Sequence, residues 1–518
     1  MDDRVIDITA TKPVKVQFVY VPKYRKPWYG KMIIGTNIPL GILYLGAYLR
    51  EKQPDLTLDV VDGTVASYSD TLARIVAFAP DVLCLSYTTM EAMSAYRLVQ
   101  DVRRRLGKVC VIVGGPHATA LPKEALERAD VDVVGIGEGE ATLHELVSLV
   151  RSEGALNYDS LRRVKGIAFR DGKQPVVNQP RPYLPELDSL PWPARDLIDL
   201  KKYQGWPFFR QKPQTNVLWS RGCPFNCTFC ANSVWRTGGL RYRIRSAHNV
   251  ADELEWLARH QGIREVFDNG DEFNTNMEAA LAICHEIKRR ELGVTWKASL
   301  RARPLTDELA RAMAESGCWF AYVGVESGNP STLAGIQKRI TPDDVVEACR
   351  ILKRYDIKVF GLFMLNNVWE EDGKLRFEDN QLSENTLRFA KHLMHSGLLD
   401  YMSWSQTTPY PGSALYDIAL RHRLIPDALI GNWDAWSRAI WLSQVIRLPG
   451  VSAREQMRVR LEGSRLVAWA TYRDSGDYRH LVRYYLSTAL RLLIANLGLG
   501  ERLARRNAPP CGPVRPGR

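Results

Sequence analysis

Short apolar runs alternate with stretches of helical periodicity from the N-terminus to about residue 155. The runs that predict strands are residues 14–22, 56–63, 81–87, 109–115 and 131–137. Apolar residues recur at helical spacing over residues 39–53, 69–77, 90–106, 122–128 and 140–152. This alternation predicts a doubly wound α/β domain, in which helices cover both faces of a parallel sheet.

The carboxyl ends of these predicted strands carry mostly small residues. Ligands bind at those ends in sheets of this kind. The residues there are Asp62, Gly63, Ser86, Gly114, Gly115, Gly137 and Glu138. Glycine allows a bulky group to approach the backbone closely. The segment GIGEGE, residues 135–140, lacks the G-x-G-x-x-G spacing, so a nicotinamide cofactor is not expected.

A second series of alternating elements runs from about residue 210 to 420. The predicted strands are 215–220, 263–270, 294–301, 319–327 and 358–365, and the predicted helices are 250–261, 279–292, 307–317 and 342–356. Repeated β/α units suggest a full or partial barrel, whose chemistry gathers at the carboxyl ends of the strands. Asp271, Arg301 and Glu326 lie at such ends. Each alone could be an ion-pair partner or a cap, but their shared placement favours a site.

A compact cysteine loop, SRGCPFNCTFCAN, follows the first strand of this region. Cys223, Cys227 and Cys230 have a C-x3-C-x2-C spacing, within a segment that Gly222, Pro224 and Asn226 allow to curl tightly. A structural zinc site needs a fourth ligand, and no second cysteine or histidine pair follows. Three cysteines on a cubane iron–sulfur cluster would leave one iron open. The alternative is a disulfide or buried free thiols.

The other six cysteines are scattered along the chain. They are Cys84, Cys110, Cys284, Cys318, Cys349 and Cys511. Those in apolar surroundings, such as Cys84 and Cys110, are interpreted as small core residues.

The composition is that of an ordinary globular protein. Of its 518 residues, 45% are hydrophobic and 25% are charged. A chain of this length can form two or three domains. The acidic N-terminus has no apolar secretory segment, and no apolar run reaches the roughly 18 residues of a transmembrane helix. We therefore expect a cytoplasmic location, with membrane association as a further possibility.

Most of the net charge of +12 lies near the C-terminus. From Arg447 onward there are fourteen arginines, no lysine and five acidic residues, a balance of +9. Residues 478–494 form a basic amphipathic pattern that suits peripheral membrane contact, although a helix packed on the main domain is favoured. Residues 506–518 are predicted to be disordered. Nucleic acid is not expected as a partner, because no aromatic platform accompanies the basic residues.

Several segments resemble radical S-adenosylmethionine enzymes that carry an N-terminal cobalamin-binding domain. Beyond the cysteine loop, these are RYRIRSAHNVADELEWL, DNGDEF, GVESGNPSTLAGIQKRIT and PYPGSALYD, with PLGILYLGAYL, LSYTT, IVGGPHATALP and GIGEGEATLHELV in the front region. The resemblance spans about residues 15–420. Within this family, the sequence resembles the cobalamin-dependent class B methyltransferases.

The resemblance implies five segments. They are a flavodoxin- or Rossmann-like cobalamin-binding domain (12–155), a linker (156–209), a full or partial β/α barrel (210–420), a helical C-terminal region (421–505) and a disordered tail (506–518).

The resemblance also assigns roles around the cysteine loop. Cys223, Cys227 and Cys230 would hold a [4Fe–4S] cluster whose open iron binds the amino and carboxylate groups of S-adenosylmethionine. Phe229 would pack near the adenine and Glu326 near the nucleoside. Asp271 and Arg301 would lie near the nucleoside or the substrate. An external electron donor such as flavodoxin or ferredoxin is implied as a partner.

Cobalamin is expected over the carboxyl edge of the front sheet. The resemblance places Pro39, Gly41, Ser86, Gly114, Gly115, Gly137 and Glu138 at cofactor binding. The D-x-H-x-x-G motif is missing, because Asp62 begins DGTVASYS, and His117 is not at the position of a cobalt ligand. Cobalamin bound without a protein histidine is therefore expected.

One segment departs from the family pattern. Residues 361–379 read GLFMLNNVWEEDGKLRFED in place of a G-x-P-G-E-T-like turn. The segment is either a surface insertion or a changed substrate wall to which Asn366, Asn367, Trp369 and Glu370 contribute.

The function implied is methyl transfer through a 5′-deoxyadenosyl radical and methylcobalamin. The acceptor would be an unactivated carbon, or a phosphorus, of a specialised metabolite or a lipid-linked substrate. One alternative keeps both cofactors but closes a ring or rearranges a carbon skeleton. A second alternative, from another class, is a non-catalytic cobalamin or iron–sulfur sensor.

Overall fold

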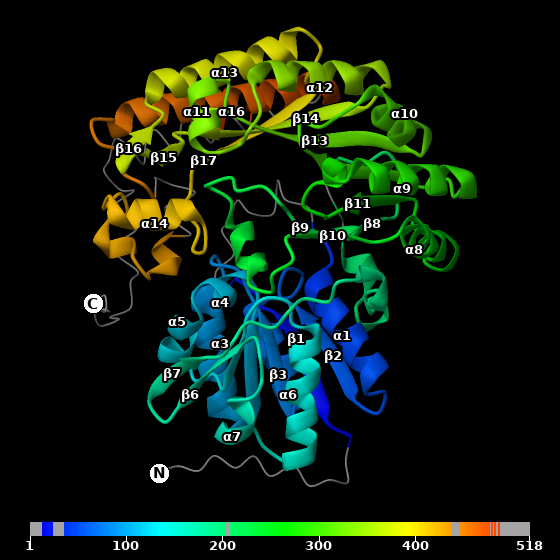
Figure 1. The fold of residues 1–518 in the computed structure, drawn as a ribbon, viewed down its shortest axis with the longest axis vertical. Coiled ribbons are helices and arrows are strands. Elements are labelled where there is room, and N and C mark those ends of the chain that lie inside the picture. The colour runs from blue at the N-terminus through cyan, green and yellow to red at the C-terminus, as the bar shows by residue number, and fades with distance from the viewer. Residues whose placement is uncertain are drawn as a thin grey trace. The chain divides into compact units, whose positions relative to one another are not determined.

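The computed structural model describes residues 13–23, 36–203, 205, 208–436, 445–476, 478, 479, 481, 482, 485 and 486. The chain divides into two compact units (Figure 1). The first unit comprises Met1–Pro224 and Asn232–Gly270, and the second comprises Phe225–Ala231 and Asp271–Arg518. The boundary therefore falls inside the cysteine loop.

The main sheet of the first unit has seven strands in the order β2-β1-β3-β4-β5-β6-β7. The strands are β1 (Lys15–Tyr20), β2 (Thr57–Asp62), β3 (Val82–Ser86), β4 (Cys110–Gly114), β5 (Val133–Gly135), β6 (Ile167–Asp171) and β7 (Gln174–Val177). The first five are parallel. Their order reverses between β1 and β3, which is the doubly wound arrangement predicted from the sequence.

Helices follow the parallel strands of this sheet. They are α1 (Leu40–Lys52), α2 (Tyr68–Phe78), α3 (Ala92–Leu106), α4 (Pro116–Ala120), α5 (Pro122–Arg128) and α6 (Glu140–Glu153). Helix α1 packs against α6 (Figure 1). Helix α2 packs against α3. Because the strands are covered by helices, residues such as Val16, Phe18 and Val82 are fully buried.

The segment predicted as a linker, residues 156–209, contains ordered elements. Helix α7 (Tyr158–Leu161) precedes β6 and β7, which extend the sheet in antiparallel fashion. Gly172, with φ +62°, lies in the turn between them. The sheet is thus mixed, because a hairpin needs no crossover helix to add its strands.

The rest of the first unit leads up to and follows the cysteine loop. It contains β8 (Gln214–Val217), β9 (Ser220–Gly222), β10 (Tyr242–Ile244), α8 (Ala247–His260) and β11 (Glu265–Asp268). Strands β8 and β11 are parallel, and β9 pairs with β10 in antiparallel fashion.

The second unit continues the β/α alternation that the sequence predicts. Four parallel strands are paired in the order β17-β14-β13-β12: β12 (Thr295–Leu300), β13 (Cys318–Glu326), β14 (Lys358–Leu365) and β17 (Tyr401–Gln406). The helices between and around them are α9 (Met277–Arg290), α10 (Asp307–Glu315), α11 (Pro330–Gly335), α12 (Pro342–Arg354), α13 (Asn380–His395) and α14 (Ala414–Arg421). The carboxyl ends of these strands lie along one edge.

The segment that departs from the family pattern forms a β-hairpin. Strands β15 (Val368–Glu371) and β16 (Lys374–Phe377) are joined by Asp372 and Gly373, both with positive φ, which is a common two-residue hairpin turn. A Cβ on Gly335 of α11 would lie 2.4 Å from the Trp369 ring, so Trp369 packs on α11. Glu370 pairs with Arg421 and His422. These two side chains therefore have structural partners within the second unit.

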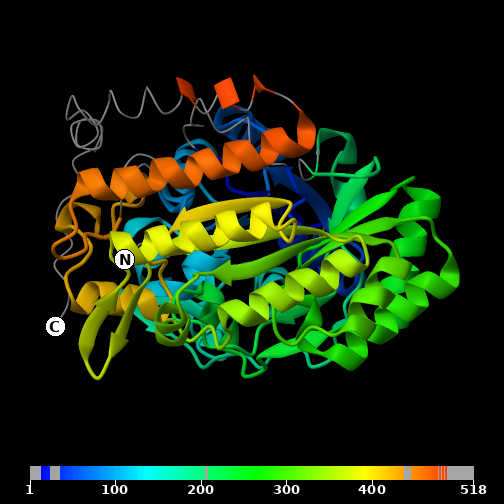
Figure 2. The ribbon, with the colours of Figure 1, turned by 90° about the horizontal axis from the view of Figure 1, so that it is seen from above.

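A long C-terminal helix, α16 (Ala453–Ser475), packs on α13 and β17 (Figure 2). Ser452 caps it in a reciprocal pair with Glu455. Arg473 donates to the carbonyl oxygens of Met394 (2.8 Å) and Leu399 (3.0 Å). The extension thus belongs to the packed body of the second unit.

Most of the basic segment 478–494 and the whole tail 506–518 lie outside the described residues. The predicted membrane contact and disorder stay predictions. Among the residues that are described, no helix is both long and apolar enough to cross a membrane.

Candidate active site

The cysteine loop begins where β9 ends at Gly222. This glycine has φ +83°, and a Cβ on it would lie 2.2 Å from the Arg241 carbonyl oxygen, so no side chain fits there. Arg236 donates to the Cys223 carbonyl oxygen at 3.2 Å. The chain is therefore fixed on both sides of Cys223 within the first unit.

The later part of the loop is held in the second unit through Thr228. Its amide donates to the Ile336 carbonyl oxygen at 3.0 Å, and its carbonyl oxygen accepts from the Leu415 amide at 2.9 Å. The Cys230 amide donates to the Cys227 carbonyl oxygen at 3.1 Å. These bonds hold Cys227 and Cys230 in a tight turn.

The cysteines fall into two groups. Cys223, Cys227 and Cys230 are half-buried, whereas the other cysteines in the described part of the chain are buried, and none of the eight forms a disulfide: Cys84, Cys110, Cys284, Cys318 and Cys349 are the buried ones. Burial raises the pKa of the Cys284 thiol to about 12, which makes it inert as a ligand. The disulfide half of the alternative for the loop is therefore wrong, and Cys84 and Cys110 are core residues as predicted.

The described residues contain no group of three or more His, Cys, Asp or Glu side chains close enough to hold one metal ion.

Arg301, which follows β12, lies beside the loop. Its Nη1 is 3.9 Å from Cys227 Sγ, and its guanidinium carbon is 3.9 Å from the centre of the Phe225 ring. Asn274 fixes the Arg301 backbone through bonds of 2.8 Å and 3.0 Å. Arg301 is only 2% exposed, so water screens its charge weakly and its electrostatic interactions are stronger than at the surface.

Glu326 ends β13 in a left-handed conformation with φ +62°, which is strained for a residue with a side chain. Its Oε1 accepts from Lys338 Nζ at 2.9 Å, and both residues are buried. Burial lowers the pKa of Lys338, but Glu326, Glu272 and Cys227 raise it by more, so the pKa lies above its usual value. Lys338 is therefore a fixed cation at this edge.

Glu272 completes the group of charges. Its Oε1 lies 3.9 Å from Arg301 Nη1. Burial raises the pKa of Glu272, with Lys338 and Arg301 opposing that effect and Glu326 and Asp271 adding to it. Sequence reasoning missed Glu272 and Lys338, although both stand in quoted motifs, DNGDEF and GIQKRI.

Two polar atoms of this group stay open. Arg301 Nη2 and Glu272 Oε2 are buried and have no hydrogen-bond partner among the described residues. A buried polar atom without a hydrogen-bond partner lowers the stability of the folded state unless a ligand or a water supplies that bond. A ligand that carries both a carboxylate and an ammonium group has the charges to satisfy both, so the residues present fit the amino acid end of S-adenosylmethionine.

Two further residues were predicted to belong to this site. These residues, Phe229 and Asp271, are half-buried. Their roles beside the adenine and the nucleoside stay predictions.

The carboxyl edge of the first sheet has its switch point between β1 and β3. Pro39 precedes α1, which follows β1, and Ser86 ends β3, so these two residues flank that point. A Cβ on Gly41 would meet no atom within 4 Å, and one on Gly114 would come no closer than 3.8 Å to another atom. Packing does not explain these two glycines, which fits the close approach of a large cofactor.

Gly115 and Gly137 have reasons of their own to be glycine. Their φ angles are +96° and +79°, and a Cβ would lie 2.8 Å from the Tyr87 carbonyl oxygen and 2.8 Å from Tyr183 Oη, respectively. This packing neither supports nor opposes a cofactor role.

Glu138 lies in a buried ion-pair network with Glu140 and two arginines. Arg243 Nη1 donates to Glu138 at 3.1 Å, and Arg221 pairs with Glu138 at 3.5 Å and with Glu140 at 2.8 Å. Arg221 stands two residues before Cys223. The network therefore ties the start of the cysteine loop to the loop after β5.

His117 is an interior residue. Its ring is buried, with Nδ1 3.1 Å from Thr89 Oγ1 and Nε2 3.8 Å from Glu124. These contacts agree with the expectation that it is not a cobalt ligand.

Two families match the chain. The Radical SAM superfamily matches residues 217–375, and the B12 binding domain matches residues 33–147. The fold is thus a B12-binding domain followed by a radical SAM domain, as predicted.

Individual proteins extend this match. An uncharacterized methyltransferase of Pyrococcus horikoshii is 32% identical over 413 residues, which cover 79% of this chain and 83% of the relative. The anaerobic magnesium-protoporphyrin IX monomethyl ester cyclase of Synechocystis sp. is 28% identical over 408 residues, which cover 76% of each chain. A radical S-adenosylmethionine methyltransferase from Kitasatospora setae, solved with cobalamin and a [4Fe–4S] cluster bound, shares the fold with a TM-score of 0.61, at 19% identity over 80% of this chain and 79% of its own.

The fold and the cysteine loop define a radical S-adenosylmethionine enzyme with an N-terminal cobalamin-binding domain. The chain belongs to the cobalamin-dependent radical S-adenosylmethionine family, whose members include methyltransferases. Its cofactors are a [4Fe–4S] cluster, S-adenosylmethionine and cobalamin. Membership of an enzyme family argues against the non-catalytic sensor.

Proposed function

We propose that this enzyme methylates an unactivated carbon, or a phosphorus, of a specialised metabolite or a lipid-linked substrate. The pair of open buried atoms, Arg301 Nη2 and Glu272 Oε2, supports binding of S-adenosylmethionine beside Cys227, which Arg301 contacts. A site that only held a structural cluster would have no need of them. The observation that favours methyl transfer is the 32% identity to a relative named as a methyltransferase.

Each residue of the candidate site has a proposed role. Cys223, Cys227 and Cys230 bind the cluster, and Thr228 keeps the last two in place. Arg301 and Glu272 bind and orient the amino acid end of S-adenosylmethionine. Lys338 holds the Glu326 carboxylate, so that the strained end of β13 keeps one geometry beside the nucleoside. Phe229 and Asp271 complete the nucleoside site.

The first unit is proposed to hold cobalamin at the β1–β3 switch point. Pro39, Gly41, Ser86 and Gly114 would line the approach, with Gly115, Gly137 and Glu138 behind them. When bound, the cluster supplies the electron that splits S-adenosylmethionine to give a 5′-deoxyadenosyl radical, and cobalamin carries the methyl group. The protein positions the reacting groups and excludes water.

A flavodoxin or ferredoxin is the proposed physiological donor of the electron, and a low-potential chemical reductant replaces it in the assay.

Ring closure or rearrangement is the second candidate. It is favoured by the similarity to the relative named as a magnesium-protoporphyrin IX monomethyl ester cyclase. In that case both cofactors would bind, but no methyl group would reach a product.

An anaerobic assay separates the two candidates. The reconstituted enzyme is incubated with hydroxocobalamin, a low-potential reductant and S-adenosylmethionine that carries a deuterated methyl group. Methyl transfer predicts both 5′-deoxyadenosine and labelled methyl on cobalt by mass spectrometry. 5′-Deoxyadenosine without labelled cobalamin would contradict methyl transfer and favour the second candidate.

A further inference from the structure

Glu378 is a fully buried carboxylate at the end of the segment that departs from the family pattern. It stands between β16 and α13 and is 0% exposed. Its Oε1 accepts from Ser327 Oγ at 2.5 Å and from Asn329 Nδ2 at 3.2 Å. Its Oε2 accepts from the Asn367 amide at 3.2 Å and from Asn367 Nδ2 at 2.9 Å. These four donors occupy the lone-pair positions of a carboxylate, which leaves no place for a proton.

The Glu378 carboxylate is held without a counter-charge. All four donors are uncharged, and in the described part of the chain no lysine, arginine or histidine pairs with Glu378. A buried charge lowers the stability of the fold unless hydrogen bonds replace those that water made. The carboxylate therefore fixes the positions of all the groups that donate to it.

The donors come from the ends of two neighbouring strands. Ser327 directly follows β13, and Asn367 lies two residues beyond the end of β14 at Leu365. The two strands are paired, and their register shifts between Gly324 and Glu326. Such an irregularity redirects a side chain at the end of a strand. Glu378 bridges the two strand ends just beyond it.

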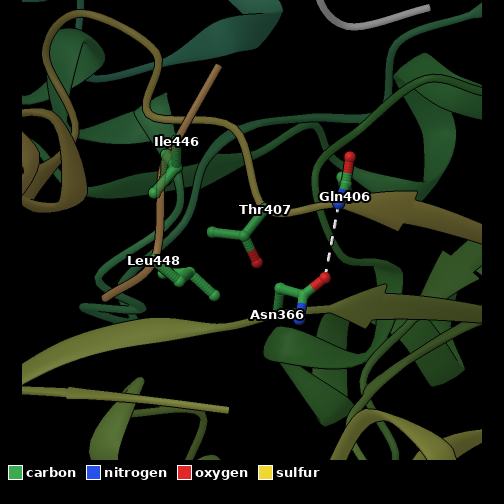
Figure 3. Close-up of a pocket in the computed structure, with 5 residues that line it drawn as sticks. All are labelled: Asn366, Gln406, Thr407, Ile446 and Leu448. Atoms are coloured by element: carbon green, nitrogen blue, oxygen red, sulfur yellow. Dashed lines mark hydrogen bonds between the residues drawn. The ribbon is translucent and has the colours of Figure 1, made fainter. Parts of the chain in front are cut away.

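The same network reaches the end of a third strand, β17. Asn366 Nδ2 donates to the Glu378 carbonyl oxygen at 3.4 Å, and Asn366 Oδ1 accepts from Gln406 Nε2 at 3.3 Å (Figure 3). Thr407 Oγ1 donates to Asn367 Oδ1 at 3.3 Å. Glu378 therefore links the carboxyl ends of three adjacent strands, which is where β/α folds place their chemistry.

Glu326 is fixed on two sides. Lys338 Nζ holds its carboxylate at 2.9 Å. On the other side its backbone continues into Ser327, whose amide donates to the Val325 carbonyl oxygen at 2.8 Å. The Ser327 hydroxyl is in turn held by Glu378. Because the φ of Glu326, +62°, is strained for a residue with a side chain, it persists only where surrounding contacts enforce it.

We propose that Glu378 is a positioning residue: through Ser327 it holds the Glu326 side chain in the geometry that binds the nucleoside of S-adenosylmethionine. This inference rests on the proposed function, which places Glu326 beside the nucleoside. The segment that departs from the family pattern then serves the cofactor site by supplying the buried charge that fixes the end of β13.

The test compares two ligands of the full-length, anaerobically reconstituted protein: S-adenosylmethionine and methionine, which has the same amino and carboxylate groups but no nucleoside. Without a reductant the cluster does not cleave S-adenosylmethionine, so equilibrium dialysis gives both affinities. Glu378→Gln is expected to bind S-adenosylmethionine about tenfold more weakly, because the nucleoside contact is misplaced. Its affinity for methionine should stay within about twofold of the wild type, since the amino acid end is bound elsewhere. A variant that is merely unstable would lose both ligands.

Two further variants keep the test decisive. Ser327→Ala removes only the bond between Glu378 and the turn after Glu326, and it should weaken S-adenosylmethionine selectively by about threefold. This variant decides the question if urea unfolding shows that Glu378→Gln does not fold. Glu371→Gln, at an exposed acid of the same segment that pairs with Arg376, is the matched control and should bind both ligands as the wild type does.

The outcomes separate this inference from the proposed function. Undiminished affinity for S-adenosylmethionine in the folded Glu378 and Ser327 variants, or an equal loss of both ligands, would overturn the positioning role. Transfer of labelled methyl to cobalt by the wild type is measured separately. A wild type that transfers no methyl, while Glu378→Gln loses S-adenosylmethionine selectively, contradicts the proposed function alone. A wild type that transfers methyl, while Glu378→Gln binds S-adenosylmethionine normally, contradicts this inference alone.

Discussion

Arg301 Nη1 lies 3.9 Å from Cys227 Sγ, and the same guanidinium lies 3.9 Å from the centre of the Phe225 ring. Two residues of the cysteine loop thus position one buried cation. Because Arg301 Nη2 stays open, the cation is held in place and still able to bind a ligand. Such pre-organisation at a strand end is what a cofactor site requires.

Glu272→Gln is expected to stabilise the protein in the absence of S-adenosylmethionine. The pKa of Glu272 is raised in the folded state, chiefly by burial, so its contribution to stability is complete below its unfolded pKa and is lost as the pH rises through the folded pKa. At pH 7.5 the glutamine variant should therefore gain about 0.5–2 kcal/mol in urea unfolding, and the gain should vanish at pH 4. Glu278→Gln, at an exposed acid in the first turn of α9, serves as the control and should show no gain. A destabilised Glu272→Gln protein at pH 7.5 would argue against an unsatisfied carboxylate.

Lys338→Met is expected to destabilise the protein by about 3–5 kcal/mol, because the Glu326 carboxylate loses its buried partner. The double variant Lys338→Met with Glu326→Gln should recover part of that loss. Since the pKa of Lys338 is raised above its usual 10.5, the pair stabilises the fold fully below that pH and less as the pH rises through the folded pKa. Chemical unfolding at pH 7.5 measures the difference, with Lys374→Met on the exposed hairpin as the control. Equal losses in the single and double variants would contradict the coupling.

Arg221→Met should loosen the start of the cysteine loop. Loss of its bonds to Glu138 and Glu140 is expected to cost about 3–5 kcal/mol of stability and to lower the iron content after reconstitution. Arg241→Met, at an exposed arginine of the same segment, should leave both unchanged. Full iron content in a destabilised Arg221→Met protein would limit the network to a structural role in the first unit.

Gly114→Ala and Gly115→Ala should behave differently. A Cβ on Gly114 has room, so the variant is expected to keep its unfolding free energy within about 0.5 kcal/mol while binding cobalamin at least tenfold more weakly. Gly115 has φ +96° and no room, so its variant should lose about 1–3 kcal/mol of stability without any cofactor. Denaturant titration and absorbance titration with hydroxocobalamin give the two quantities. Unweakened cobalamin binding by Gly114→Ala would move the cofactor away from the end of β4.

Much of the secondary structure followed from periodicity. The helix predicted at 69–77 is Tyr68–Phe78, and the one predicted at 122–128 is Pro122–Arg128. The sequence analysis missed the β6–β7 hairpin, which lies in the segment interpreted as a linker. Both strands are short, and the residues of β7 are half-buried or exposed, so they give no clear apolar pattern.

The candidate site was predictable only in part. The cysteine spacing is local, so the sequence shows it directly. The partners of Lys338, Glu272 and Glu138 are set by tertiary packing, at a separation of 12 residues for Lys338 and Glu326 and of 105 for Arg243 and Glu138, and no periodic pattern marks them. The hydrogen bond that Gln406 donates to Asn366 joins two strand ends that are far apart in the chain, and no sequence motif specifies it.

The most direct test of the central claim is the affinity of the anaerobically reconstituted enzyme for S-adenosylmethionine and for its decarboxylated analogue. The wild type is expected to bind the analogue at least tenfold more weakly, because Arg301 Nη2 loses its carboxylate partner. Arg301→Gln should bind S-adenosylmethionine more weakly and discriminate between the two compounds less than the wild type does, because only the expected bond of the carboxylate to the open iron remains. Arg303→Gln, at an exposed arginine two residues away, should discriminate as the wild type does. Undiminished discrimination in Arg301→Gln would contradict the assignment of this cluster of charges to the amino acid end of S-adenosylmethionine.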